Sequence, residues 1–435
     1  MTKKDFISIE GSDRRNFIKK AGGATLFSAA ILNTGFANSF LSKNKVLKVG
    51  LVGCGGRGTG AAVQALRADP DTVLHAMADA FEDRLVSSLE ILKKAHGPRA
   101  DVKKSLQFVG FDAYQKLIDS GVDVVLLATP PGFRPAHLTA AIDAGKHVFY
   151  EKPVAVDAPG IRKVLEAAKK AKEKNLSIVS GMCFRYDLQK QALFGKVLNG
   201  DIGEVKSISS SRCGGELWYK ERQPDWSDME YKMRNWYYYN WLGGDFIVEM
   251  FVHSMDMISW VMGEKMPLSA SGVGGRQWRT DKKYGNIYDH FAVELDYGGG
   301  LKGNVFTRQL TGGSSSNSVE IAGSDGNAFY EGNRHEIWGK NAWKYEGEKN
   351  DMYQSEHDAF FNSIRKGDAT NDGEMAANST LMAIMSRDAA YSGQIITWEE
   401  AMNSKASLGP DNNQYSWDLK FDGPPTAIPG AIKVV

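Results

Sequence analysis

Short apolar runs alternate with helical patterns in the part of the chain that spans residues 45–175. The runs with strand character are residues 46–52, 73–78, 123–128 and 147–150. Residues 59–68 and 136–144 have a helical pattern of apolar and polar positions. Strands that alternate with helices predict an α/β Rossmann-type domain with a doubly wound parallel sheet, in which ligands bind beyond the carboxyl ends of the strands.

The pattern changes over residues 176–408, where strand-like alternation is interrupted by few helices. The expected strands are residues 205–212, 269–278, 287–295, 301–308 and 319–322. This pattern predicts a second, α+β domain with an open, largely antiparallel sheet. Two helical stretches, about residues 353–366 and 373–392, follow the strands. We expect the proline-rich tail, residues 409–435, to wrap around the surface.

A glycine-rich turn joins the first expected strand to the first expected helix. It reads Gly53-Cys54-Gly55-Gly56-Arg57-Gly58, which has the spacing Gly-x-Gly-x-x-Gly. Gly53 permits the tight turn, Gly55 lets the backbone approach a pyrophosphate, and Gly58 allows close packing of helix on strand. Amide groups at the helix N-terminus are then available to the phosphates. The turn therefore predicts a dinucleotide site.

An acid follows at the distance that a dinucleotide site requires. Asp79 ends the second expected strand, about 20 residues after the last glycine. A carboxylate there accepts hydrogen bonds from the ribose 2′-hydroxyl and repels a 2′-phosphate, and the next residues, Ala80 and Phe81, include no arginine. We therefore expect NAD rather than NADP. The alternative is an ordinary glycine turn, with Asp79 as a helix cap.

The first 37 residues have the order of an export signal. Arg14 and Arg15 precede a mildly apolar stretch, residues 21–32, and a small-residue run at residues 35–37. The arginine pair resembles the twin-arginine (Tat) signal, and the apolar stretch is shorter than the roughly 20 residues of a membrane span. We expect the Tat export machinery to carry the folded protein to the periplasm. The alternative is a basic amphipathic helix of a cytoplasmic enzyme.

Composition narrows the classes of function. The 435 residues are too many for a single core and predict two domains with appendages. A formal net charge of +1 gives no basic footprint for nucleic acid. The three cysteines form neither a metal-type pair nor a disulfide framework, and the eight histidines lack the spacing of metal ligands. We therefore expect no metal centre.

Several motifs follow the glycine turn in a fixed order. They are Ala-Thr-Pro-Pro at residues 128–131 with His137 after it, Glu-Lys-Pro at 151–153, Phe-Arg-Tyr at 184–186, Gly-Asp-Ile-Gly-Glu-Val at 200–205, and Gly243-Gly244 before Glu249, His253 and Asp256. With the turn, they resemble the glucose–fructose oxidoreductase / inositol dehydrogenase (Gfo/Idh/MocA) family over nearly all of residues 46–405. The resemblance implies an NAD-dependent oxidoreductase that acts on CH–OH groups, and a homodimer or homotetramer.

The expected carboxyl edge of the parallel sheet carries four of these side chains: Thr129, Pro130, Glu151 and Lys152. We expect them, with His137, at the cofactor. The resemblance places Lys152 beside the nicotinamide and the reacting hydroxyl, where a lysine can relay the hydroxyl proton as hydride leaves. The alternative is a surface lysine at the end of a strand.

Glu249, His253 and Asp256 fall on a helix that we expect from about residue 246 to residue 262. Offsets of four and three place them along one helical face, where an acid can orient the imidazole. The resemblance matches His253 to the catalytic histidine and Asp256 to the acid after it, but Glu249 stands where polyol dehydrogenases usually have aspartate. The alternative is that His253 is an ordinary core residue.

Residues 218–241 are rich in tryptophan and tyrosine. Aromatic rings such as Trp236 suit one face of a sugar, so this segment is a candidate wall or lid over the nicotinamide; the alternative is core or subunit packing. Further candidates for the rim of the substrate pocket are Arg185, Tyr186, Tyr288 and Asp289. Glu356-His357-Asp358 is set aside as an acidic helix start.

Three hypotheses for the function remain. The first is oxidation of a secondary hydroxyl of a sugar, glycoside or cyclitol, with NAD bound tightly and regenerated in the same site, because no free NAD pool is expected outside the cytoplasm. The second is an NAD-dependent glycosidase or lyase that oxidises C3 transiently and eliminates the glycosidic substituent. The third is a non-enzymatic sugar-binding relative, which the presence of Lys152 and His253 disfavours.

Overall fold

The computed structural model describes residues 45–410 and 414–431. The chain divides into two units, residues 1–40 and 41–435, and the expected export signal, residues 1–37, lies outside the described residues. In the part that the structure describes, no helix combines the length and the apolar character that crossing a bilayer requires.

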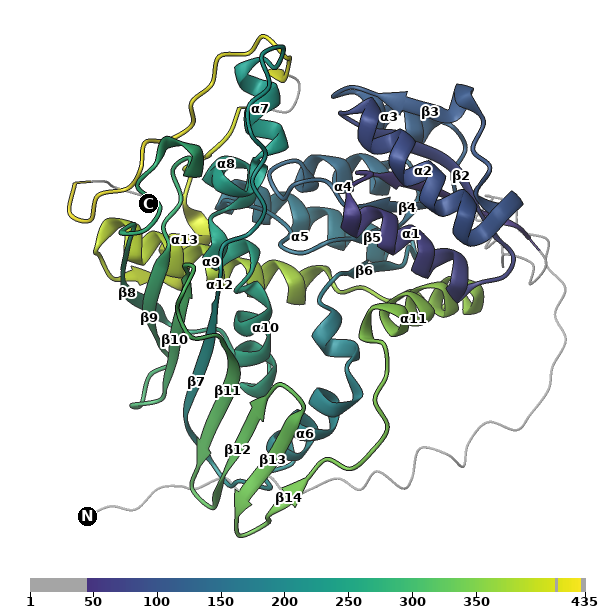
Figure 1. Cartoon of the computed structure of the whole chain (residues 1–435). Helices are drawn as coiled ribbons and strands as arrows, with labels where there is room; N and C mark the ends of the chain where they lie inside the picture. The colour runs from purple at the N-terminus through teal and green to yellow at the C-terminus, as the bar shows by residue number, and fades with distance from the viewer. Residues whose placement is uncertain (1–44, 411–413, 432–435) are drawn as a thin grey trace, which may run out of the picture. The chain divides into compact units, whose positions relative to one another are not determined.

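A parallel sheet of six strands forms the first half of the larger unit (Figure 1). Its strands are β1 (Leu47–Val52), β2 (Thr72–Asp79), β3 (Gln107–Val109), β4 (Val124–Leu127), β5 (His147–Tyr150) and β6 (Ile178–Ser180). The helices between them are α1 (Gly56–Ala68), α2 (Glu82–His96), α3 (Ala113–Asp119), α4 (Arg134–Asp143) and α5 (Ala158–Glu173). The order β3-β2-β1-β4-β5-β6 confirms the doubly wound fold and places the switch point between β1 and β4.

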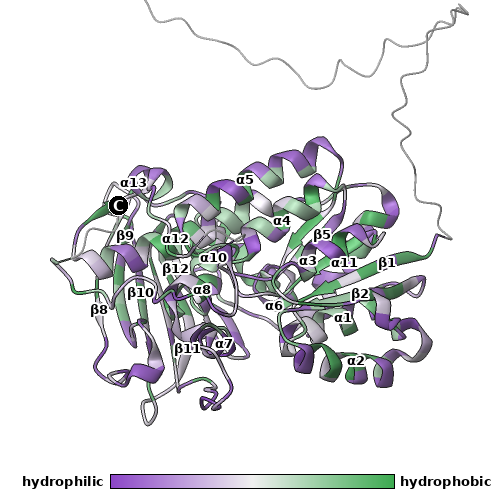
Figure 2. Ribbon diagram, turned by 90° about the horizontal axis from the view of Figure 1, so that it is seen from above, coloured by the Kyte–Doolittle hydropathy of each residue, from purple (hydrophilic) through white to green (hydrophobic). Residues whose placement is uncertain are grey.

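Burial explains why these runs form strands. All four residues of β4 are buried, as expected for a parallel strand covered by helices on both faces. The helices are amphipathic instead: α5 buries one apolar face, and Asp157 caps its start by accepting a hydrogen bond from the Gly160 N–H at 2.9 Å. Figure 2 shows this contrast as apolar strands between helices whose outer faces are hydrophilic.

A mixed sheet of nine strands forms the second half, in the order β14-β13-β12-β11-β7-β10-β9-β8-β15. Its strands are β7 (Val205–Gly214), β8 (Ser269–Gly275), β9 (His290–Asp296), β10 (Lys302–Gln309), β11 (Ser316–Gly323), β12 (Gly326–Glu331), β13 (Arg334–Gly339), β14 (Trp343–Lys344) and β15 (Ile396–Thr397). All neighbours are antiparallel except β7 and β10. This confirms the largely antiparallel sheet.

Helices cover one face of this sheet. Of these, α6 (Leu188–Leu198) packs on β13, α10 (Val252–Val261) on β7 and α12 (Gly373–Ser392) on β8 (Figure 1). Other helices of this half are α7 (Asp228–Arg234), α8 (Asn240–Gly243), α9 (Phe246–Glu249), α11 (Met352–Lys366) and α13 (Trp398–Asn403). Side chains on the strands alternate between buried and exposed, and Val273 (69% exposed) and Phe306 (51% exposed) belong to the open face.

Two features depart from the expected organisation. The sixth parallel strand, β6, lies beyond residue 175, so the first sheet extends past the expected boundary. Helix α11 packs on α1, and its Phe360, Phe361 and Ile364 are buried in the same cluster as β1. Chain from the expected second domain therefore completes the core of the first.

Candidate active site

The glycine turn connects β1 to α1 at the switch point. Gly53 has a φ of +95°, and a Cβ there would lie 2.6 Å from the carbonyl carbon of Ala128. A Cβ at Gly58 would lie 1.8 Å from the Gly53 oxygen, so side chains are excluded at both positions. Nothing lies within 4 Å of the Cβ position of Gly56, where α1 begins. The turn is therefore packed on its inner side and open toward the cavity above the helix N-terminus.

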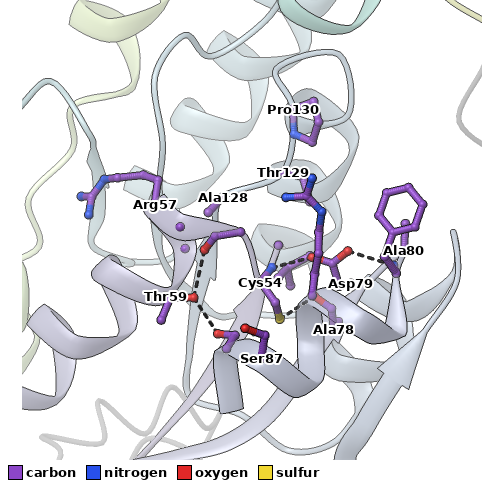
Figure 3. Close-up of a pocket in the computed structure, with 18 of the residues that line it drawn as sticks. Cys54, Arg57, Thr59, Ala78, Asp79, Ala80, Ser87, Ala128, Thr129 and Pro130 are labelled. Carbon is purple, nitrogen blue, oxygen red and sulfur yellow. Dashed lines mark hydrogen bonds between the residues drawn. The ribbon is translucent and has the colours of Figure 1, made fainter. Parts of the chain in front are cut away.

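Asp79 at the end of β2 fixes this turn. Its carboxylate accepts hydrogen bonds from the Cys54 N–H at 2.6 Å and the Phe81 N–H at 2.9 Å (Figure 3). Burial raises the pKa of Asp79, and these two bonds oppose the rise. A carboxylate with lone pairs left over at this strand end suits the 2′-hydroxyl of a ribose.

A cavity of about 1180 Å³ lies over the turn. Small-molecule sites usually have about 300–1,000 Å³, so this one has room for a dinucleotide. Of the residues expected at the cofactor, those that line it are Gly53, Gly55, Gly56, Arg57, Gly58, Asp79, Thr129, Pro130 and His137. The glycine cradle, the open helix N-terminus and the acid at β2 together fit NAD. Those groups would hold its pyrophosphate and adenosine ribose.

His137 is held in its neutral form beside Thr129. Its Nδ1 lies 3.2 Å from the Thr129 hydroxyl, and its ring stacks on Tyr114 at 4.0 Å. Burial and the charge of Arg134 lower the pKa of His137 to about 3. An uncharged imidazole in the cavity wall can give or accept a hydrogen bond without adding charge.

Arg84 also lines the cavity, although the sequence analysis did not identify it as a candidate. Its Nη1 lies 3.4 Å from the Cβ position of Gly55, above the phosphate-binding turn. The sequence motif considers only the residues next to the acid, so it does not detect an arginine five residues after Asp79. It adds a cation for the pyrophosphate.

Arg57 points away from Asp79 (Figure 3). It forms ion pairs with Glu151 and, at 2.9 Å, with Glu356 of α11. Burial, and then the charge of Glu151, raise the pKa of Glu356 well above its usual range. Glu151 is therefore engaged by Arg57, and a Cβ at Gly181 would lie only 2.7 Å from its carboxylate. Glu151 is not among the residues that line the cavity.

Lys152 follows β5 and meets Glu249. Its Nζ lies 3.0 Å from Glu249 Oε1 and donates to the Glu249 backbone oxygen at 2.6 Å. The second bond exists because the expected helix over residues 246–262 is two helices, which corrects the prediction. Phe251 N–H donates to Phe246 O, five residues back, so the turn widens at Met250 and the Glu249 carbonyl accepts from the lysine.

His253 lies in the first turn of α10, with its ring 4.7 Å from that of Phe184. Burial, followed by the charges of Lys152 and Arg212, lowers its pKa well below the usual value. Its Nδ1 is buried, with no hydrogen-bond partner among the described residues. The imidazole is therefore neutral and close enough to Lys152 to be influenced by its charge.

Asp256 does not orient His253. Its two oxygens accept from Arg185 at 2.8 Å each, and Ser379 donates a third bond at 3.0 Å. Arg185 also pairs with Glu264 and lies over the Trp260 ring at 4.8 Å. Asp256 and Arg185 therefore neutralise each other's charge. Asp256 was expected to serve His253 and Arg185 to line the substrate pocket, but in the structure the two side chains bind one another.

Three other rim candidates lie elsewhere. The Tyr186 hydroxyl donates to Asp372 at 3.3 Å. Tyr288 is 1% exposed, and its hydroxyl donates to the Ala427 oxygen at 3.0 Å. Asp289 is fully buried and accepts from the backbone N–H groups of residues 277–279. The alternation of apolar and polar residues could not show whether these polar side chains form buried hydrogen bonds or line the rim of a pocket.

Part of the aromatic segment, residues 218–241, lines the cavity, and part of it packs in the core. Trp218, Trp226 and Trp236 line the cavity. The remaining rings are largely in the core: Tyr237, Tyr238, Tyr239 and Trp241 are each less than 10% exposed. Arg234, from the same segment, was not singled out, yet it lines the cavity and pairs with Asp83 of α2.

Two of the three residues of the motif set aside in α11 are buried, and Asp358 is exposed. Asp351 caps this helix, whereas Glu356 and His357 are fully buried and His357 packs edge-on against Phe149 at 4.1 Å. The sequence did contain one signal for this burial, because the apolar residues Phe360 and Phe361 follow Glu356 and His357 on the same helix. No group of three or more potential metal ligands is assembled in residues 45–410 and 414–431.

Comparison with known proteins agrees with this geometry. The model for the "Oxidoreductase family, NAD-binding Rossmann fold" of Gfo/Idh/MocA matches residues 47–178, and that for the "GFO/IDH/MocA C-terminal domain" matches residues 192–329. Myo-inositol 2-dehydrogenase of Thermotoga maritima is 26% identical over 288 residues, which are 65% of this chain and 75% of that protein. A glycosyl hydrolase family 109 protein of Shewanella baltica is 26% identical over 219 residues, 45% of this chain and 46% of that one.

Solved structures share the fold. Myo-inositol 2-dehydrogenase from Lactobacillus plantarum has a TM-score of 0.62 at 19% identity, with coverage of 81% of this chain and 99% of that one. GenD2 from gentamicin A biosynthesis, in complex with NAD, has a TM-score of 0.62 at 17% identity, with coverage of 86% and 99%.

Proposed function

The chain belongs to the Gfo/Idh/MocA oxidoreductase family, and on that premise we propose that it oxidises a secondary hydroxyl of a sugar, glycoside or cyclitol with tightly bound, recycled NAD. The observation that carries the proposal is the meeting of Lys152 with Glu249, beside His253, at the carboxyl end of β5. Relatives in the family include dehydrogenases of inositol.

The residues at this edge can manage the hydroxyl proton. NAD⁺, when bound, supplies the hydride acceptor. Lys152 is fixed by the carboxylate and the backbone oxygen of Glu249, so its amine has one defined position in which to bind the reacting hydroxyl. His253 is neutral, so its imidazole can accept the proton as the C–H bond breaks.

Contacts between the two halves support tight retention of the cofactor. Arg234 forms two hydrogen bonds of 3.1 Å with Asp83, and its guanidinium lies 4.1 Å from the Phe81 ring centre. Desolvation would raise the pKa of Asp83, but the Arg234 bonds lower it. Asp83 and Phe81 lie just after Asp79, so this clamp closes over the expected adenosine end of the cavity.

The C-terminal tail reinforces the clamp. Trp417 packs on Phe111 at 4.5 Å and on Phe81 at 5.3 Å, and Tyr415 packs on Phe133 at 4.7 Å. Phe81, Phe111 and Phe133 all line the cavity. An aromatic pair contributes about 0.5–1.5 kcal/mol beyond burial, so release of the cofactor past these rings requires several such contacts to open.

Export and assembly complete the proposal. The arginine pair Arg14-Arg15 supports Tat export to the periplasm, where recycling of a retained cofactor is required. Val273 and Phe306, both exposed, are aligned with the partly buried Ala292 across β8, β9 and β10 on the open sheet face, which supports a homodimer through this surface.

Two measurements test the oxidoreductase activity. We expect NAD to co-purify with the chain, and incubation with polyols and sugars to yield a keto product in the wild type but not in Lys152→Ala. Lys169→Ala, which changes a lysine on the outside of α5, serves as the matched control. Full turnover by Lys152→Ala would exclude the proposed role of the lysine.

A second candidate is an NAD-dependent glycosidase, which the glycosyl hydrolase family 109 relatives favour. Transient oxidation at C3 makes the C2 proton acidic, so that the glycosidic substituent can leave before water adds and the ketone is reduced again. Release of an aryl group from aryl glycosides without added NAD supports this cycle, whereas net NADH with a free sugar supports the dehydrogenase.

A further inference from the structure

The wide turn between α9 and α10 anchors two cations instead of one. The Glu249 carbonyl accepts from Lys152 Nζ at 2.6 Å, and the next carbonyl, that of Met250, accepts from Arg212 Nη1 at 3.1 Å. Both cations are therefore held at the same turn, by the carbonyl oxygens of adjacent residues. The charges of both also lower the pKa of His253, after the larger effect of burial.

Arg212 belongs to a polar row on the helix-facing side of the sheet. In β7 it is in register with Asn317 of β11. Asn317 Nδ2 donates to the Tyr330 hydroxyl at 3.1 Å, and its Oδ1 is buried with no partner among the described residues. An unpartnered buried carbonyl oxygen is costly unless a ligand pairs with it, so this row has the properties of a binding surface.

The charges around His253 do not balance. Lys152 pairs with Glu249, Lys190 pairs with Asp187 at 2.9 Å, and Arg57 pairs with carboxylates near β5. Arg212 forms no ion pair within residues 45–410 and 414–431, and only its Nη1 has a hydrogen-bond partner there. One positive charge, with Nε and Nη2 available as donors, therefore remains beside the reacting groups.

We propose that Arg212 binds a carboxylate of the substrate, so that this site oxidises an acidic sugar such as a hexuronic acid. The inference rests on the proposed oxidoreductase function and narrows its substrate class. A planar guanidinium matches a carboxylate in two parallel hydrogen bonds. A carboxylate neutralises the charge of Arg212, whereas a neutral sugar would leave that charge unpaired in a partly buried site.

The test compares ligands that differ only in charge. The NAD-loaded protein is titrated calorimetrically with D-glucuronate and D-galacturonate, and with the neutral amides of both. We expect at least one acid to bind more tightly than its amide. Arg212→Gln should weaken binding of that acid about 10- to 100-fold, as expected for loss of a charge-assisted hydrogen-bonded pair, while the amide loses much less. Arg212→Lys keeps the charge and should recover part of the preference.

The outcomes separate this proposal from the function on which it rests. The proposal is overturned if the wild type binds acid and amide with equal affinity, or if Arg212→Gln still prefers the acid. It is also overturned if a hexose 6-phosphate binds more tightly than both hexuronic acids. If the wild type oxidises neutral hexoses or cyclitols but binds neither acid, the substrate class is wrong and the oxidoreductase function stands. If neither acidic nor neutral sugars are oxidised or cleaved, the proposed function fails. Near-ultraviolet circular dichroism confirms that the variants are folded.

Discussion

The substitution Trp417→Ala tests whether the tail retains the cofactor. Trp417 belongs to the C-terminal tail, while both of its ring partners, Phe81 and Phe111, belong to the first domain and line the cavity. If these contacts exist only while the cavity is closed, they must break before NAD leaves. Their removal therefore lowers the barrier to release without touching the glycine turn or Lys152.

The magnitude follows from the two ring contacts. Aromatic pairs contribute about 0.5–1.5 kcal/mol each, so two of them give about 1–3 kcal/mol, and the dissociation rate of NAD should rise about 5- to 150-fold. The rate is measured by loading the protein with labelled NAD and chasing with excess unlabelled NAD. Bound NAD per chain after prolonged dialysis should fall in parallel.

Phe421→Ala is the matched control. Phe421 is also a partly buried aromatic residue of the tail, but it packs edge-on against Trp241 at 5.1 Å, within the second half of the chain. The reasoning is refuted if Trp417→Ala exchanges NAD at the wild-type rate, or if Phe421→Ala accelerates exchange equally. In the second case the tail would act by stabilising its own domain.

Three further predictions concern the clamp, the assembly and a buried histidine. Arg234→Gln should also speed NAD release, whereas Arg222→Gln, whose contacts to Trp226, Asp228 and Tyr231 all lie within its own segment, should not. Phe306→Glu should convert a dimer to monomers in light scattering, and a wild-type monomer would contradict the proposed interface. Burial and the charge of Arg57 lower the pKa of His357 to about 3, so below about pH 6.5 the unfolded chain binds more protons and the folded state loses about 2 kcal/mol by about pH 5. His357→Leu should remove this loss, and an unchanged difference in urea-unfolding free energy between about pH 8 and about pH 5 would contradict it.

Local patterns were sufficient for most of the fold. The apolar run of β4 and the amphipathic pattern of α5 can be read from the sequence. The expected bounds of the two late helices differ by at most one residue from those of α11 and α12. The short β12 and β13 were missed because hairpin strands near a sheet edge carry exposed polar residues and lack a long apolar run. The glycine turn was found because its glycines are fixed by local sterics.

Partners far apart in the sequence could not be predicted. The offset from Glu249 to His253 indicated a shared helical face, but the wide turn at Met250 directs Glu249 to Lys152 instead. Asp256 was expected to serve the histidine, yet Arg185 occupies it from a segment 71 residues away. Which acid meets which cation depends on tertiary packing, and spacing along one element contains no information about it.

If the cofactor is retained as proposed, the positions of the clamp and the reacting groups would let it be used repeatedly. The clamp closes on residues after β2 and β3, whereas Lys152 follows β5. In the order β3-β2-β1-β4-β5-β6, three strand spacings separate β2 from β5, which is about 14 Å at roughly 4.8 Å per strand. A substrate that enters beside β5 therefore does not have to displace Arg234 or Trp417. On the proposed function, successive sugars would exchange at one end while the other end stays closed, which is the condition that regeneration of NAD within a single site requires.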